Sequence, residues 1–391
     1  MMFVEDEKTI NQRVGRKLKD LRRAYGLKAK DLAARSGISQ SLLSKIEHGQ
    51  AAISIAVLSR LGGVLGRPIS YFFQLDEEIP KVLGTMTTVP GPENRGLEFF
   101  AREVERRSEG RIWLIPLKAT QLDSSVNNVR LLEQGLIDLF IEEMTFFHHL
   151  APAVNIMALP YSFQSEAHLE AFLTGDFFEA QIKQRIKAAG LRFINRRWNW
   201  RRGLERVLLS SRPITRPEQV KGLKVRVPAV PVLISFWRAM GAEPVVIPWP
   251  QVKAAWLKAE IDLLPTHKAH LFPLGFCQRG RYVSCLGDLP PALPVVVNET
   301  KYKALPPTVQ KALEEACDAA GDYFSAEIVR SEADNEAANM ARYKVAYLKV
   351  DLAPWKNEAE RVRRLLISSG ELDGQAWAEV ERLSATGGVA L

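Results

Sequence analysis

The sequence contains little cysteine and no long apolar run. Its 391 residues include three cysteines, Cys277, Cys285 and Cys317, none with the C-x-x-C spacing of a zinc site. An odd number of thiols gives no even disulfide framework, so we expect a reducing compartment and buried thiols. No uninterrupted apolar stretch approaches the roughly 18 residues that a membrane helix needs. We therefore expect no contact with a membrane.

Short motifs of several enzyme classes are also missing. The chain has no G-x-S-x-G, H-E-x-x-H, P-loop or G-x-G-x-x-G pattern. His148-His149 and His267-x2-His270 lack a third ligand nearby in sequence, so we interpret them as surface or core histidines. Residues 1–8 are acidic and lack the apolar core of a secretory signal, which favours a cytoplasmic location. We expect no enzyme activity, no metal and no cofactor.

The charge, in contrast, is plentiful and unevenly distributed. The whole chain has 53 Lys+Arg and 45 Asp+Glu, a formal net charge of +8. Residues 1–75 contain 13 Lys/Arg and 6 Asp/Glu, whereas residues 76–391 contain 40 and 39. About one fifth of the chain carries nearly all the excess charge, which indicates a basic module attached to a neutral body.

The basic module has the pattern of a small helical domain. Helices are expected at residues 14–25, 31–34, 39–47, 54–65 and from Pro68 onward, with Ser, Gly and Pro signals at their ends. The second and third are joined by the short turn Ser36-Gly37-Ile38, which predicts a helix-turn-helix. After the N-cap Ser39, the polar face of the third helix presents Gln40, Ser41, Ser44 and Lys45. Gln pairs well with adenine, Lys with guanine and Ser with either.

The order of these residues resembles the lambda-repressor-like, or XRE-type, DNA-binding domain. The matching positions are Leu21-Arg22-x3-Gly26-Leu27-x4-Leu32-Ala33-x3-Gly37-Ile38-Ser39-x4-Ser44-x2-Glu47-x-Gly49. The resemblance implies a double-stranded DNA partner. The family often has Ser/Thr and then Gln where this chain has Lys28 and Ala29, so Lys28 or Lys30 would supply the phosphate contact. A module used only for protein contacts is the alternative interpretation.

The remaining residues alternate strand-like and helical runs. Strands are expected at 81–87, 111–117, 136–141, 192–200, 223–227, 243–247 and 293–298. Helices are expected at 96–108, 125–133, 165–175, 177–189, 231–240, 251–259, 307–346 and 372–383. This alternation predicts an α/β architecture with largely parallel sheets. Its length exceeds that of a usual single core, so we expect two lobes.

Arginine is concentrated in two places in this body. Arg226 ends an expected strand just before a helix, and ligands of open α/β sheets bind beyond the carboxyl ends of strands. An arginine there offers a planar fork for a carboxylate or phosphate. Six further arginines fall within residues 192–206, interleaved with Trp198 and Trp200. This cluster has three interpretations: an extended ligand pocket, a second nucleic-acid patch, or a surface that is solvated or contacts a partner subunit.

A second resemblance covers roughly residues 81–365. Gly222–Pro228, Gly241-Ala242-x-Pro244 and Trp249-x-Gln251-Val252 are similar to solute receptors of tripartite ATP-independent (TRAP) transporters, the DctP type. Further pieces agree in order at 100–112, 121–122, 135–138, 158–161, 254–262 and 305–310. The resemblance implies a two-lobed, periplasmic-binding-protein-like α/β domain that closes on a small organic acid.

The same resemblance implies which residues bind the acid. Arg226 would pair with the ligand carboxylate. The other implied cleft residues are Arg206, Trp249, Glu143 and Phe147. Thr266 stands where the family has a ligand-contacting Asn, and Lys253 replaces a Tyr. The pocket is therefore expected to differ from the family beyond its carboxylate anchor.

These features predict a multidomain protein, with an all-α helix-turn-helix domain at 8–75, a linker at 76–80 and a two-lobed α/β domain at 81–391. The expected function is a cytoplasmic one-component transcriptional regulator. It would bind an operator as a homodimer and sense a small carboxylate. Two alternatives stay open: a metabolite-binding protein or enzyme of organic-acid metabolism with a DNA-tethering module, and a ligand-independent DNA-binding protein.

Overall fold

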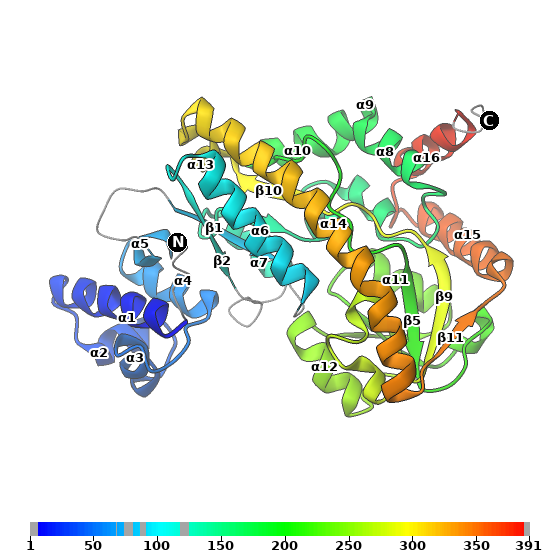
Figure 1. Cartoon of the computed structure of the whole chain (residues 1–391), viewed down its shortest axis with the longest axis horizontal. Coiled ribbons are helices and arrows are strands. Elements are labelled where there is room, and N and C mark those ends of the chain that lie inside the picture. Colours follow the sequence, from blue (N-terminus) through cyan, green and yellow to red (C-terminus); the bar gives the residue numbers. More distant parts are fainter. Residues whose placement is uncertain (1–6, 68, 74–80, 87–90, 118–124, 387–391) are drawn as a thin grey trace.

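The computed structural model describes residues 7–67, 69–73, 81–86, 91–117 and 125–386. A small helical domain precedes a larger α/β domain that contains two sheets (Figure 1). The expected start of the fifth helix at Pro68 and the expected linker at 76–80 lie outside the described residues.

The third and fourth helices of the small domain begin where their serine caps place them, whereas the first two begin before the expected residues 14 and 31. The helices are α1 (Glu7–Ala24), α2 (Ala29–Arg35), α3 (Gln40–Glu47), α4 (Ile55–Val64) and α5 (Ile69–Phe73). Ser39 Oγ caps α3 by accepting a hydrogen bond from the Leu42 amide at 3.1 Å. Gly37, in the turn before α3, adopts a φ of 63°, which only glycine tolerates easily. The predicted helix-turn-helix is confirmed.

The first lobe is built on a five-stranded sheet with the order β2-β1-β3-β10-β4. The strands are β1 (Lys81–Met86), β2 (Trp113–Leu117), β3 (Leu139–Ile141), β10 (Val295–Asn298) and β4 (Leu191–Phe193). The helices of this part of the chain are α6 (Pro92–Arg107), α7 (Ser125–Glu133), α8 (Glu166–Thr174), α9 (Asp176–Phe178), α10 (Gln184–Ala188) and α13 (Glu299–Ala304). A π-helical turn at Glu179–Lys183 joins α9 to α10, and 3-10 helices span Met144–Phe147 and Pro152–Met157.

The second lobe is built on a six-stranded sheet with the order β11-β9-β5-β8-β6-β7. The strands are β11 (Ala346–Lys349), β9 (Tyr282–Asp288), β5 (Arg206–Ser210), β8 (Leu263–His267), β6 (Lys224–Val227) and β7 (Glu243–Val246). Its helices are α11 (Pro231–Ala239), α12 (Trp249–Leu257) and α15 (Leu352–Ser368), with 3-10 helices at Pro217–Val220, Lys268–His270 and Phe276–Gln278. The last helix, α16 (Gly374–Thr386), packs against α8 of the first lobe.

The chain crosses between the lobes after β4, after β9 and along α14 (Pro307–Tyr343). This 37-residue helix packs against α6 in the first lobe and leads into β11 of the second, so it runs along both lobes (Figure 1). The crossings explain why the two-lobed α/β fold is confirmed while the prediction of largely parallel sheets is wrong. After the first two crossings, β5 and β10 enter their sheets antiparallel to both of their neighbours.

Two expected elements end earlier than the sequence predicts. The strand expected at 192–200 stops at Phe193, because the chain leaves the first sheet there and Trp200 is buried in the core. The helix expected to reach 346 stops at Tyr343, because Lys344 turns into the left-handed region at φ 57° and β11 follows. Strands β5, β8, β9 and β11 and helices α13 and α15 were not predicted.

Candidate functional site

A cavity of about 180 Å³ lies between the lobes, at the ends of their strands. This volume is more than ten times the roughly 10–15 Å³ that a single buried water needs. Glu143 contributes from the first lobe, Arg202 from the first crossing segment, and Arg226 and Thr266 from the second lobe. The cavity therefore occupies the position where ligands of α/β proteins bind.

Five of the residues that the second resemblance implies line this cavity: Arg226, Arg206, Trp249, Thr266 and Glu143. The placement of Phe147 in the cleft is wrong. Phe147 is fully buried in the core near Phe140, and its neighbour Phe146 lines the cavity instead. Both belong to a 3-10 helix, in which successive side chains point about 120° apart. Only one of two adjacent phenyl rings can therefore face the cavity.

Arg226 carries the charge that is available to a ligand. Its Nε donates to the Ile247 carbonyl at 3.1 Å, and its guanidinium lies 5.3 Å from the centre of the Trp249 ring. Within the described part of the chain it makes no ion pair with a carboxylate. Burial lowers the pKa of Arg226 to about 10, and the attraction of Glu143 and Glu142 offsets this only in part. A desolvated cation of this kind favours an anion beside it.

The other two cavity arginines already have carboxylate partners. Arg206 Nε lies 2.7 Å from Asp288 Oδ2 at the end of β9. Arg202, with only 4% of its side chain exposed, lies 2.9 Å from Glu93 Oε1 and 2.6 Å from Glu142 Oε1. These arginines neutralise buried carboxylates, so they shape the cavity more than they attract a further charge.

Two histidines bind first-lobe carboxylates from the second lobe. His267 Nε2 lies 3.0 Å from Glu143 Oε1, and His270 Nε2 lies 2.7 Å from Glu93 Oε1. His267 ends β8 and His270 ends the 3-10 helix that follows, so one short segment makes both contacts. Both histidines line the cavity and bridge the lobes. The interpretation as plain core or surface histidines missed this role.

The pKa values of His267 and Glu143 determine the protonation state of each partner in this pair. Burial lowers the pKa of His267 to about 4, although its hydrogen bond to Glu143 opposes the shift. Burial alone would raise the pKa of Glu143, but His267, Arg206 and Arg202 outweigh it and hold that pKa below its ordinary range. At neutral pH the pair is therefore a carboxylate that accepts a hydrogen bond from a neutral imidazole.

Acidification should consequently weaken the larger domain. Because both folded-state pKa values lie below the unfolded ones, the unfolded chain binds more protons, and stability falls as pH drops below about 6.5. For His267 we expect a loss of about 2 kcal/mol between pH 6.5 and 5. Urea unfolding of wild type and His267→Gln measures it, with His149→Gln as control. Equal pH dependence in wild type and His267→Gln would contradict the assignment.

The arginines of residues 192–201 are mostly engaged within the chain. Arg192 pairs with Glu299, Arg196 with Asp318 and Arg197 with Asp322. The tryptophans between them are packed: Trp198 lies against Phe178 and Phe193, and the Trp200 indole donates to the Cys317 carbonyl at 3.0 Å. Trp200 is fully buried, so its ring is not available to stack on nucleic-acid bases. Of the six arginines in this cluster, only Arg202 and Arg206 line the ligand cavity. The interpretation as an extended ligand pocket therefore applies to these two residues alone.

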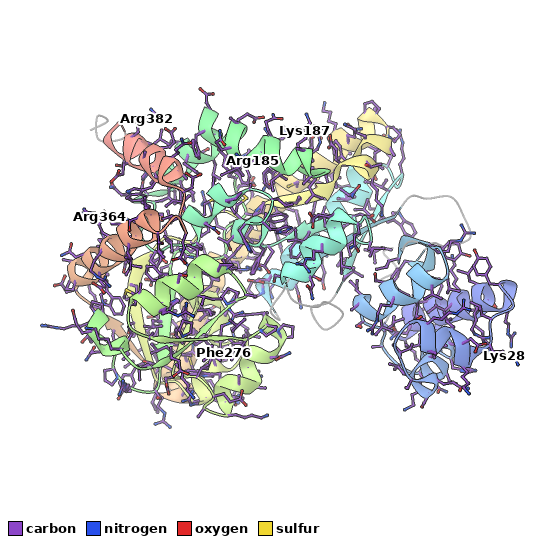
Figure 2. All side chains as sticks on the ribbon, turned by 180° about the vertical axis from the view of Figure 1, so that it is seen from behind. Lys28, Arg185, Lys187, Phe276, Arg364 and Arg382 are labelled. Atoms are coloured by element: carbon purple, nitrogen blue, oxygen red, sulfur yellow. The ribbon has the colours of Figure 1, made fainter. Side chains whose placement is uncertain are left out.

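The predicted DNA-reading residues are all exposed in the helix-turn-helix. Gln40, Ser41, Ser44 and Lys45 are exposed on α3, and Lys28 is exposed ahead of α2 at the outer edge of the domain (Figure 2). The Ser39 hydroxyl oxygen is occupied as the α3 cap. Ser39 therefore positions the reading helix as well as lying at its start.

A salt bridge that the sequence did not predict fixes α3 against α1. Arg22 Nε lies 2.6 Å from Glu47 Oε1 and Nη2 lies 2.8 Å from Oε2, a bidentate pair with little exposure. Gly15 allows the close approach, since an added Cβ would lie 2.1 Å from the Ile46 carbonyl oxygen. The opposite charges at two motif positions, Arg22 and Glu47, were the available signal.

The thiols, possible metal ligands and helix lengths of the described residues offer little further chemistry. Cys277, Cys285 and Cys317 are free, and burial raises the pKa of Cys277 to about 12, which makes it a poor nucleophile. Among the described residues no group of three or more His, Cys, Asp or Glu side chains is arranged to hold a metal ion. No helix within these residues combines the length and apolarity required to traverse a bilayer.

Two lobes, their crossing segments and a charged cavity between them define a two-lobed solute-binding protein. The family model described as "Bacterial extracellular solute-binding protein, family 7" (DctP) matches residues 83–368. The chain belongs to this family. A second model, described as "Helix-turn-helix", matches residues 18–72, in agreement with the XRE-type domain.

Individual relatives agree with this family. A solute-binding protein of Roseobacter denitrificans is 27% identical over 237 residues, which is 60% of this chain and 71% of that protein. The 2,3-diketo-L-gulonate-binding periplasmic protein of Escherichia coli is 25% identical over 56% of this chain and 66%, just under two thirds, of its own length.

Solved structures show the same fold. A TRAP periplasmic solute-binding protein from Roseobacter denitrificans, with bound L-galactonate, has a TM-score of 0.70 at 24% identity. The match covers 79% of this chain and 99% of that one. A second, from Sulfurospirillum deleyianum with bound succinate, has a TM-score of 0.69 at 20% identity, covering 78% of this chain and all of that one.

Proposed function

We propose that this protein is a one-component transcriptional regulator that senses a small carboxylate. The observation that carries the proposal is Arg226, a desolvated cation without an ion-pair partner among the described residues, placed in a cavity between two lobes. The helix-turn-helix supplies the DNA-binding part. In this proposal the domains divide near residues 76–80, the protein acts in the cytoplasm, and it has no catalytic step.

The coupling between the two parts follows from lobe closure. A ligand that prefers the closed cleft changes how the lobes sit, and in a homodimer this changes the separation of the two α3 helices. Dimers of this motif contact half-sites about one helical turn, ~34 Å, apart. We expect the acid to change operator affinity by a factor of about 5 to 150, the usual range of allosteric coupling.

The exposed face of α3 should determine DNA binding. Gln40→Ala and Lys45→Ala each remove a side chain suited to a base edge, so each should weaken binding to DNA flanking the gene by about 1–3 kcal/mol. Fluorescence anisotropy at fixed salt measures this, with the exposed Lys253→Ala on α12 as control. Affinity equal to wild type in both α3 variants would refute this reading helix.

Binding of acids is the direct test of sensing. A thermal-shift screen of small carboxylic acids should raise the melting temperature of the wild-type protein, because ligand binding stabilises the folded state. The acid with the largest shift is then added to the anisotropy experiment. Operator affinity that does not respond to a bound acid would favour the ligand-binding alternative, in which the helix-turn-helix only tethers the protein.

A further inference from the structure

Much of the cavity lining is apolar. Large side chains from α11 and α15 and from the Met144–Phe147 turn form this apolar wall: Phe146, Leu233, Phe236, Trp237, Met240 and Trp355. Phe236 and Trp237 pack edge to face, with ring centroids 5.7 Å apart, and both are buried. A ligand that touches this wall therefore meets aromatic and aliphatic surface.

Three polar side chains of the lining already have hydrogen-bond partners within the protein. The Tyr161 hydroxyl donates to the Leu286 carbonyl at 2.8 Å, and the Trp355 indole donates to the Thr215 carbonyl at 3.3 Å. Thr266 Oγ1 lies 3.3 Å from His270 Nδ1. A ligand with many hydroxyls would lose its hydrogen bonds to water and regain only part of them from the remaining groups, such as His267 Nδ1, which disfavours its binding.

The charges of the lining accommodate one negative group. Arg202 and Arg206 are paired with carboxylates, so Arg226 is the one cavity arginine without such a partner among the described residues. Glu143, whose partner His267 is neutral at neutral pH, lies in the same lining and would repel a second carboxylate.

We infer that the ligand is a monocarboxylate with an apolar body, held by Arg226 at its carboxylate and by the α11–α15 wall along its body. This inference rests on the proposed function, since it specifies which acids the cleft selects. It separates this chain from the similar solved structures with bound L-galactonate or succinate.

Isothermal titration of the full chain with two sets of acids tests the inference. Phenylacetate, cinnamate and hexanoate form one set, and L-galactonate, D-glucuronate and succinate form the other. We expect at least one apolar acid to bind about 30-fold or more tightly than every acid of the second set. Tighter binding of a sugar acid or succinate would overturn the inference and leave the proposed function standing. Binding of none of the six acids would overturn both.

A pair of adjacent substitutions on α11 tests the position of the apolar body. Leu233 lines the cavity, whereas Ile234, equally half-buried and next to it, does not. Leu233→Asn should weaken binding of the best apolar acid about tenfold or more, and Ile234→Asn less than threefold. Thermal melting of both variants checks that each is folded. Equal losses of affinity in the two folded variants, or no loss in Leu233→Asn, would overturn the placement.

Discussion

Replacing Arg226 by alanine should weaken binding of the carboxylate ligand by at least about 100-fold. A guanidinium fork makes two charge-assisted hydrogen bonds to a carboxylate, and each contributes about 1.5–3 kcal/mol. Among the described residues, Arg226 donates a hydrogen bond only from its Nε, to the Ile247 carbonyl. Its terminal nitrogens therefore remain available to the ligand. Isothermal titration with the best acid measures the loss.

The same substitution should not destabilise the ligand-free protein. Burial lowers the pKa of Arg226, which means that its charge is unfavourable where it stands, so alanine relieves that cost. The exposed Arg238→Ala on α11 serves as the matched control for both measurements. An affinity within fivefold of wild type would show that the carboxylate binds elsewhere.

Replacing Arg202 by methionine should destabilise the larger domain by about 3–5 kcal/mol. The substitution removes the cation between Glu93 and Glu142, both almost completely buried, and leaves their charges uncompensated. The effect should be smaller at low pH, where the carboxylates take up protons. Urea unfolding, monitored by tryptophan fluorescence, measures the change.

An exposed arginine of the same cluster provides the control. Arg197 pairs with Asp322 at 2.8 Å, but both side chains are more than half exposed. Such a pair contributes about 1 kcal/mol or less, so Arg197→Met should change stability little. Similar losses in Arg197→Met and Arg202→Met would mean that the buried network around Glu93 contributes no more than a surface ion pair.

Local patterns in the sequence were sufficient to predict the helix-turn-helix and the position of Arg226. Ser39 and Gly37 specify a cap and a turn by their own chemistry, and the strand ending near Arg226 is followed directly by a helix. These features depend on neighbours within a few residues. For that reason they can be read without knowing the rest of the fold.

The partners of the remaining charges could not be predicted, because they are distant in sequence. Arg202 and Glu93 are 109 residues apart, and His270 and Glu93 are 177 apart. The same holds for Arg197, whose partner stands on α14. The choice between Phe146 and Phe147 depended on a single turn of 3-10 helix, which no periodicity in the sequence reveals.

The two contacts that His267 and His270 make across the cleft have a consequence for any response to ligand. Because each joins the two lobes, opening of the cleft would break them, and in the proposed mechanism they would supply part of the free energy of closure. A ligand shifts the equilibrium only by the difference between its affinities for the open and closed forms. Stronger histidine contacts would raise the apparent affinity for the ligand, but they would leave a smaller open population for the ligand to shift to the closed form. In the proposed regulator these two side chains would therefore set the dynamic range, the ratio of DNA occupancy with and without ligand.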